Sequence, residues 1–109
     1  MDEPQYLALA ERTFRSIEAA LDATDAEDVD CERAGDVLTL TFKDNRRCVL
    51  NTQRPTKQLW LAANARAWHF SYDEAAAKWL DDKGKKEELF ATLTAIIKAQ
   101  AGIDVALGH

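Results

Sequence analysis

An acidic stretch contains the residues of this sequence that are best suited to chemistry. Residues 22–32, DATDAEDVDCE, include six carboxylates and no lysine or arginine. Glu18 extends the series, so that seven acids lie between Arg15 and Arg33. Clustered carboxylates offer oxygen ligands, which suit hard cations such as iron, calcium, magnesium or manganese and suit a closed zinc site poorly. The outward-facing acids that could supply such oxygens are Glu11, Glu18, Asp22, Asp25, Asp28, Asp30 and Glu32.

The spacing of these acids predicts an exposed surface. From Glu11 to Asp25 they follow one ridge of a helix, beside its apolar positions. From Asp28 onward they alternate outward along the strand that should follow the helix. Oxygens on such an open surface cannot converge into a six-ligand cage. Metal binding is therefore expected to be weak and exchangeable.

A solubilising face is the simplest alternative explanation, and two local costs count against it. Asp22 and Asp25 fall in the last helical turn, where the macrodipole makes an acid unfavourable by about 0.3 to 1 kcal/mol. Glu18 and Asp22 are like charges four residues apart, which is also unfavourable. We interpret the stretch as functional, either for a cation or for a basic partner protein. Because crowded carboxylates resist ionising, we expect raised pKa values and a net repulsion at pH 7.

A tryptophan marks a second candidate surface. Leu59 and Leu61 alternate inward, so Trp60 should point outward, and the same rule turns His69 outward between two inward aromatic residues. An exposed tryptophan is unusual and indicates a contact surface. This surface could be framed by Asn51, Gln53 and Gln58.

The remaining reactive residues do not form a catalytic pattern. Neither Cys31 nor Cys48 lies beside a candidate base, and His69 is a lone imidazole. The sequence contains no glycine-rich phosphate loop and no HExxH motif. The cysteines lack CxxC spacing and are interpreted as small buried hydrophobes in a reducing compartment, with a disulfide or a metal role as alternatives. We therefore do not expect an enzyme.

The elements that must position these residues follow the order α, β meander, α. Apolar residues recur every three or four positions over 4–23 and again from Leu89 to near Gly102, which predicts two amphipathic helices. Alternating runs between them predict an antiparallel sheet of five to six strands, the last around 78–81. Both helices must bury their apolar stripes on one sheet face. Residues 1–109 are thus expected to form one α+β domain, a two-layer α/β sandwich that ends in a short tail.

The charge distribution narrows the classes of partner. The net charge is −5, and residues 1–42 carry −8 whereas residues 43–109 carry +3. An acidic pole argues against binding nucleic acid or an anionic membrane. No signal peptide and no membrane span are apparent, so a cytoplasmic location is expected.

Four segments together resemble the frataxin family, most closely its bacterial branch. They are Asp-Cys-Glu at 30–32, the run 35–42, the Asn-x-Gln-x-Pro-x-x-Gln-x-Trp-Leu pattern at 51–61, and His-Phe at 69–70. The resemblance spans essentially the whole chain. It implies an α/β sandwich that binds Fe(II) and Fe(III) weakly on its acidic ridge. It also implies docking to the cysteine desulfurase and the scaffold protein of iron–sulfur cluster assembly, with an effect on the rate of assembly.

The resemblance assigns roles to particular residues. The residues that match the ridge that binds iron in the family, and are therefore the candidate metal ligands, are Glu18, Asp22, Asp25, Asp28, Asp30 and Glu32. The residues that match its partner-binding surface are Asn51, Gln53, Pro55, Gln58 and Trp60. Two features depart from the family pattern: Ala19 and Ala23 stand where bacterial relatives often carry further acids, and the segment 71–78 is longer than the usual link.

Three functions remain open from the sequence. The first is an iron-binding regulator of iron–sulfur cluster assembly. The second is an acidic interaction module with incidental metal binding, for which iron would leave partner affinity unchanged. The third is an enzyme such as a ferroxidase, which the lack of a buried carboxylate or histidine site disfavours. A monomer is expected, with metal-induced oligomers as an open alternative.

Overall fold

The first helix begins at a capped N-terminus. The computed structural model describes residues 1–24 and 27–107, and helix α1 spans Glu3–Thr24. The backbone N–H of Gln5 donates to the Asp2 carboxylate (2.9 Å), and the Asp2 N–H donates to the Gln5 side-chain oxygen (3.2 Å). This reciprocal pair is a capping box, and Pro4 fits the first turn because its missing N–H would have no partner there. The predicted helix over 4–23 is confirmed.

Six strands follow as an antiparallel meander in which each strand pairs with the next. They are β1 (Val29–Ala34), β2 (Val37–Phe42), β3 (Arg47–Gln53), β4 (Gln58–Ala63), β5 (Arg66–Asp73) and β6 (Lys78–Asp81). A short 3-10 helix, η1 (Arg54–Thr56), joins β3 to β4. Asn64 and Ala65 link β4 to β5 with φ of 52° and 62°, as a two-residue type I′ turn requires. The segment 71–78 is the end of β5, a four-residue turn and the start of β6.

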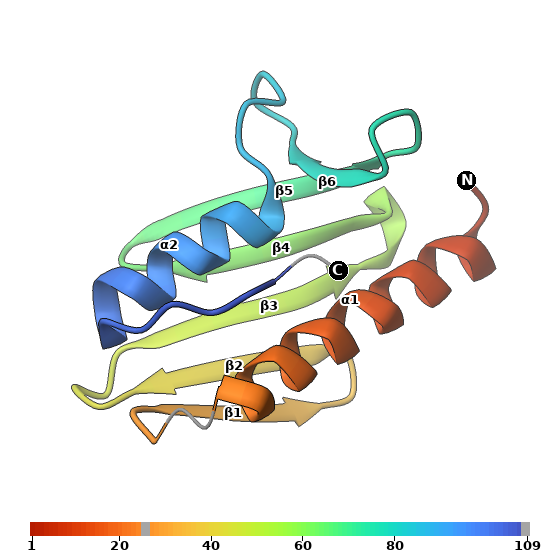
Figure 1. Cartoon of the computed structure of the whole chain (residues 1–109). Helices are drawn as coiled ribbons and strands as arrows, with labels where there is room; N and C mark the ends of the chain where they lie inside the picture. The colour runs from red at the N-terminus through yellow and green to blue at the C-terminus, as the bar shows by residue number, and fades with distance from the viewer. Residues whose placement is uncertain (25–26, 108–109) are drawn as a thin grey trace.

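Helix α2 (Leu89–Ala101) completes the predicted two-layer sandwich. The Glu88 carboxylate accepts hydrogen bonds from the backbone N–H groups of Phe90 and Ala91, which caps the first turn. Gly102 ends the helix in the left-handed region (φ 70°), where glycine is not strained. Both helices lie on the same face of the sheet (Figure 1). No helix in the described part of the chain is both long enough and apolar enough to span a membrane.

Burial alternates along the strands and determines which side chains face the helices. On β4, Leu59 and Leu61 are buried, while Gln58, Trp60 and Ala62 are more exposed. The two aromatic neighbours of His69 on β5, Trp68 and Phe70, pack inward as predicted and are 8% and 0% exposed. The core joins these strand residues to the apolar stripes of the helices, which include Tyr6, Phe14, Ile17, Leu89, Leu93 and Ile97. In the part of the chain that the structure describes, no helix lies over the opposite face of the sheet, which is called the open face below (Figure 1).

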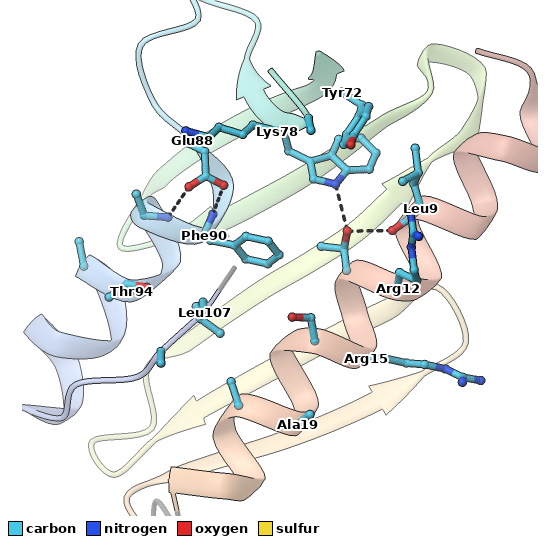
Figure 2. A pocket seen from close by; sticks show the side chains of 18 of the residues that line it. Leu9, Arg12, Arg15, Ala19, Tyr72, Lys78, Glu88, Phe90, Thr94 and Leu107 are labelled. Atoms are coloured by element: carbon cyan, nitrogen blue, oxygen red, sulfur yellow. Dashed lines mark hydrogen bonds between the residues drawn. The ribbon is translucent and has the colours of Figure 1, made fainter. Parts of the chain in front are cut away.

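The described part of the tail, 103–107, packs between the helices. Val105 is only 5% exposed, and Leu107 lines a groove of about 1290 Å³ between α1 and α2. Two of the residues that line this groove join α1 to the sheet, because the indole N–H of Trp79 on β6 donates to the Thr13 hydroxyl on α1 (3.0 Å). The same hydroxyl donates to the Leu9 carbonyl one turn earlier in the helix (2.8 Å; Figure 2). The tail is therefore part of the helical layer.

Candidate functional site: an acidic surface and an open sheet face

The acids of α1 meet an arginine from the first strand. Glu18 and Asp22 lie on α1 as predicted, and Asp22 is exposed in a last turn without any basic residue. Asp25 lies outside the described residues. Arg33 of β1 reaches the helix and donates to Glu18 Oε1 (3.1 Å). The sequence contains no base within the stretch, but the fold brings Arg33 from β1 back to the helix at Glu18.

Glu11 shares the same arginine. Arg33 donates to both carboxylate oxygens of Glu11, and Arg15 donates to its Oε2 (2.7 Å). These hydrogen bonds, first from Arg33 and then from Arg15, lower the pKa of Glu11 from 4.5 to about 2. The expectation that crowding raises carboxylate pKa values is therefore wrong at Glu11. The reason is a base contributed by another element.

The acids that follow the helix lie in a turn and on an edge strand. Asp30 and Glu32 are exposed on β1, which confirms their predicted outward alternation. The residues directly across from them on β2 are the neutral Thr41 and Thr39. Asp28 lies in the turn before β1, with Lys43 Nζ 3.7 Å from its carboxylate. Both partners of that pair are largely exposed, so it contributes little to stability.

We call Glu18, Asp22, Asp28, Asp30 and Glu32 the acidic surface. Burial, and after it the charges of Glu18 and Asp30, raise the pKa of the half-buried Cys31 thiol to about 11. Glu18 therefore lies close to the helix-facing side of β1, where Arg33 also contacts it, while Asp30 and Glu32 alternate to the other side of that strand. The protonated thiol is a poor metal ligand, so the surface offers oxygen.

The acidic surface is open. Among residues 1–24 and 27–107, no three carboxylate, histidine or cysteine side chains form a group that could hold a metal ion. A cation bound here would keep part of its water shell, as hard cations do when few protein oxygens converge. Both cysteines are free thiols, and burial raises the pKa of Cys48 to about 12. Cys48 is therefore an inert core residue.

The predicted partner-binding residues gather where β3 turns into β4. Asn51 lies directly across from Trp60, and Gln53 lies directly across from Gln58. The alternation of both strands places these four side chains on the open face. Pro55 is exposed in η1, the link between the two strands. The structure thus brings all five residues together at one end of the open face.

Trp60 lies outward, as predicted. It is half-buried, whereas its neighbours Leu59 and Leu61 are 0% and 1% exposed. Its cover comes in part from His69, the residue directly across on β5, whose ring stacks on the indole with centroids 4.2 Å apart. Sequence reasoning turned both residues outward and missed that they pair. The signal for the pairing is the two-residue turn at 64–65, because it sets residue 60 opposite residue 69.

A buried tyrosine supports this end of the sheet. Tyr6 of α1 is fully buried, and its hydroxyl donates to the Gln58 carbonyl (2.7 Å). The same hydroxyl accepts a hydrogen bond from the Gln53 N–H (3.0 Å). It therefore bridges the two strands at the last pair before they separate into η1. Burial is the main cause that raises the pKa of Tyr6, so the phenol remains neutral.

The family model and the curated relatives that this chain matches indicate the same protein family. A model of the frataxin-like domain matches residues 1–103. The iron-sulfur cluster assembly protein CyaY of Cupriavidus metallidurans is 39% identical over 110 residues, covering 98% of this chain and 96% of the relative. The protein of the same name from Delftia acidovorans is 38% identical over 106 residues, covering 94% of each chain.

Solved structures agree with these relatives. Frataxin from Psychromonas ingrahamii aligns with a TM-score of 0.91 at 30% identity and covers 100% of both chains. A trimeric frataxin from the yeast Saccharomyces cerevisiae, complexed with ferrous, has a TM-score of 0.67 at 24% identity, with 94% of this chain and 88% of the yeast chain covered. At that identity the yeast structure indicates a shared fold. With a family model matching nearly the whole chain and relatives similar over their full length, the chain belongs to the frataxin-like family.

Proposed function

We propose that this protein takes part in iron–sulfur cluster assembly, binding iron weakly on its acidic surface and docking to the cysteine desulfurase and its scaffold protein. Its relatives at 38% and 39% identity carry the name iron-sulfur cluster assembly protein, which supports the assembly role. Fe(II) or Fe(III) would be an exchangeable cargo. The protein would modulate the rate of assembly and would not itself be a catalyst.

The observation that carries the iron proposal is the uncompensated part of the acidic surface. In the described part of the chain, the ion pairs of this region are confined to Glu11, Glu18 and Asp28. Asp22, Asp30 and Glu32 are exposed to solvent, and none of the described basic side chains forms an ion pair with them. Carboxylate oxygens of this kind attract a hard cation, and their open arrangement favours rapid exchange. Asp25 remains a proposed ligand from the sequence.

The open face supports the docking proposal. Its end near η1 combines a half-buried tryptophan with the amides of Asn51 and Gln53, and Pro55 stands beside them. Tryptophan is enriched at the centres of protein interfaces, where one ring removes a large area from water. Asp30 and Glu32 of the acidic surface lie on β1, an edge strand of the same sheet. A basic region on the partner could contact these two acids while the open face docks.

A second candidate function is an acidic interaction module whose metal binding is incidental. The observation in its favour is that no three potential ligands converge among the described residues. In that case the acids would serve association with a basic surface, and iron would leave partner affinity unchanged. In either role we expect a monomer in the absence of metal.

Paramagnetic NMR tests where metal binds. Titration of the ¹⁵N-labelled protein with Mn(II), or with Fe(II) under anaerobic conditions, should broaden amide signals around Glu18, Asp22 and residues 28–32. Signals of α2 should stay sharp, because broadening falls steeply with distance from the ion. Broadening centred on His69 would contradict the acidic-surface site.

A matched pair of variants separates local binding from the effect of net charge. Asp30→Asn with Glu32→Gln removes two acids from the acidic surface, and Glu74→Gln with Asp104→Asn removes two exposed acids elsewhere. We expect the first variant to weaken metal binding several-fold and the second to leave it near the wild-type value. Equal losses in both variants would mean that overall charge, and not this surface, attracts the metal.

A further inference from the structure

The indole of Trp60 is held by a hydrogen bond as well as by its stack on His69. The two rings are nearly parallel, with an interplanar angle of 16°. The indole N–H donates to Gln58 Oε1 at 2.9 Å. Gln58 lies two residues earlier on β4, so both side chains emerge from the same face of the strand. Stack and hydrogen bond together fix the plane and the direction of the ring.

The side-chain amide of Gln58, which accepts from the Trp60 indole through its oxygen, also donates hydrogen bonds through its nitrogen. Its amide nitrogen donates to the Ser71 hydroxyl (3.1 Å) and to the Asp82 carboxylate (3.2 Å). An indole N–H can only donate and a carboxylate can only accept, so the amide has one orientation that satisfies both neighbours. Both donor hydrogens of the Gln58 amide are thereby used within the molecule.

Asp82 closes the network on the histidine. Its carboxylate oxygen lies 3.6 Å from His69 Nδ1, and its backbone N–H donates to the His69 carbonyl (2.9 Å). The path from Trp60 through Gln58, Asp82 and His69 thus returns to Trp60. It links β4 and β5 to the residue that directly follows β6. A ring of contacts across three sequence segments is much more restrictive than one hydrogen bond on an exposed strand.

We propose that Gln58, His69 and Asp82 are positioning residues that hold the Trp60 indole in one orientation, ready to dock. This rests on the proposed function, in which Trp60 contacts the partner. Gln58 then acts through Trp60, whereas the family resemblance makes it a direct partner contact. Fixing a side chain before binding removes its ordering cost, which corresponds to about two- to tenfold in affinity.

The first measurement uses the free protein and needs no partner. ¹⁵N relaxation of the Trp60 indole N–H, assigned by comparison with Trp60→Phe, reports the order of the ring. Asp82→Ala should make this indole more mobile, and Asp82→Asn should restore most of its order, because asparagine retains an acceptor oxygen for Gln58. The control Glu74→Ala removes one acid in the neighbouring β5–β6 turn and should change nothing. Unchanged indole order in Asp82→Ala would overturn the proposal.

The second measurement is affinity for the cysteine desulfurase bound to its scaffold protein. Asp82→Ala should weaken it about two- to tenfold, with Asp82→Asn and Glu74→Ala near wild type. If Asp82→Ala loosens the indole without changing affinity while Trp60→Ala does weaken binding, the positioning role is wrong and the docking surface stands. If Trp60→Ala leaves affinity unchanged, the proposal that Trp60 contacts the partner is wrong. The ¹⁵N relaxation of the indole in Asp82→Ala then shows by itself whether the ring of contacts orders Trp60.

Discussion

At the scale of single residues, Arg33 determines how much negative charge the acidic surface presents. Its side chain is 20% exposed and donates to Glu11 and Glu18, with the guanidinium 4.9 Å from the centroid of the Phe14 ring. An arginine in this position joins the edge strand β1 to helix α1 and neutralises part of the negative charge of Glu11 and Glu18. The charge available to a cation therefore shifts from the middle of α1 toward Asp22 and the acids of β1.

The lowered pKa of Glu11 predicts a pH dependence of stability. Its pKa falls from 4.5 to about 2 because the carboxylate accepts hydrogen bonds from Arg33 and Arg15. A carboxyl with a lowered folded pKa stabilises the fold fully above its unfolded pKa, and this contribution is lost as the pH falls toward the folded value. Glu11→Gln should thus melt below wild type at pH 6, and the difference should shrink between about pH 4.5 and about pH 2.

Thermal melts of both proteins over pH 2–6 measure this effect, and salt provides the control. Glu11 is 42% exposed in its ion pairs, so added salt should reduce the difference at pH 6. A difference that grows as the pH falls would mean that Glu11 is destabilised by its acidic neighbours, contrary to the geometry.

The partial exposure of Trp60 predicts a small effect on folding. Trp60→Ala loses one aromatic stack and one hydrogen bond, which should lower the free energy of unfolding by about 1 to 2 kcal/mol. Trp79→Ala is the matched control, because Trp79 is 2% exposed and truncation of a buried aromatic costs about 3 to 5 kcal/mol. Urea unfolding of the two variants makes the comparison. Equal losses would place Trp60 in the core.

At the scale of the elements, the acidic end of α1 predicts a stabilising substitution. Asp22 lies where the helix dipole is negative, in a turn without a basic residue. Asp22→Asn should therefore raise Tm by about 1 to 5 °C, while metal binding weakens. Glu3→Gln is the control, because Glu3 lies in the first turn, where an acid is favoured, and its neutralisation should lower Tm. If Asp22→Asn melts lower than wild type, this acid is a satisfied structural group.

The contact between α1 and the β3–β4 hairpin yields a second prediction at this scale. Tyr6→Phe removes the hydroxyl that bridges the Gln53 N–H and the Gln58 carbonyl. Two partly buried backbone groups then lose their partner, which should cost about 1 to 3 kcal/mol of unfolding free energy. Hydrogen exchange should also accelerate at Gln53, close to η1. An unchanged exchange rate there would mean that the two strands pair without the tyrosine.

The sequence and the structure agree wherever a local rule decides the outcome. Hydrophobic periodicity predicts both helices, alternation predicts the strands and the outward Trp60, and a two-residue turn sets Trp60 opposite His69. The contacts of Arg33 with Glu11 and Glu18 join residues 22 and 15 positions apart. They depend on how the helix crosses the edge strand, which no local pattern specifies. The orientation of the Gln58 amide and the packing of Val105 depend on tertiary structure in the same way.

At the scale of the whole molecule, the fold presents two separate surfaces, the acidic surface on α1 and β1 and the open face of the sheet. The first 42 residues carry −8 and the remainder +3, so the acidic surface forms one pole of the molecule. The proposed docking residues Asn51, Gln53, Gln58 and Trp60 lie on the open face of the sheet, and Pro55 lies in η1. Both helices lie on the other face (Figure 1). A partner that covers both surfaces would be steered by charge and held by Trp60, with an association rate that falls as salt increases.

We propose that iron bound on the acidic surface changes the affinity of this protein for the assembly machinery. The direct test is binding of the cysteine desulfurase to wild type and to the triple variant Asp22→Asn, Asp30→Asn, Glu32→Gln, each with and without Fe(II) under anaerobic conditions. We predict that iron changes the affinity of wild type and leaves that of the variant unchanged. An affinity of wild type that is the same with and without iron, together with weaker binding by the variant, would contradict the claim and identify the acids as a docking surface alone.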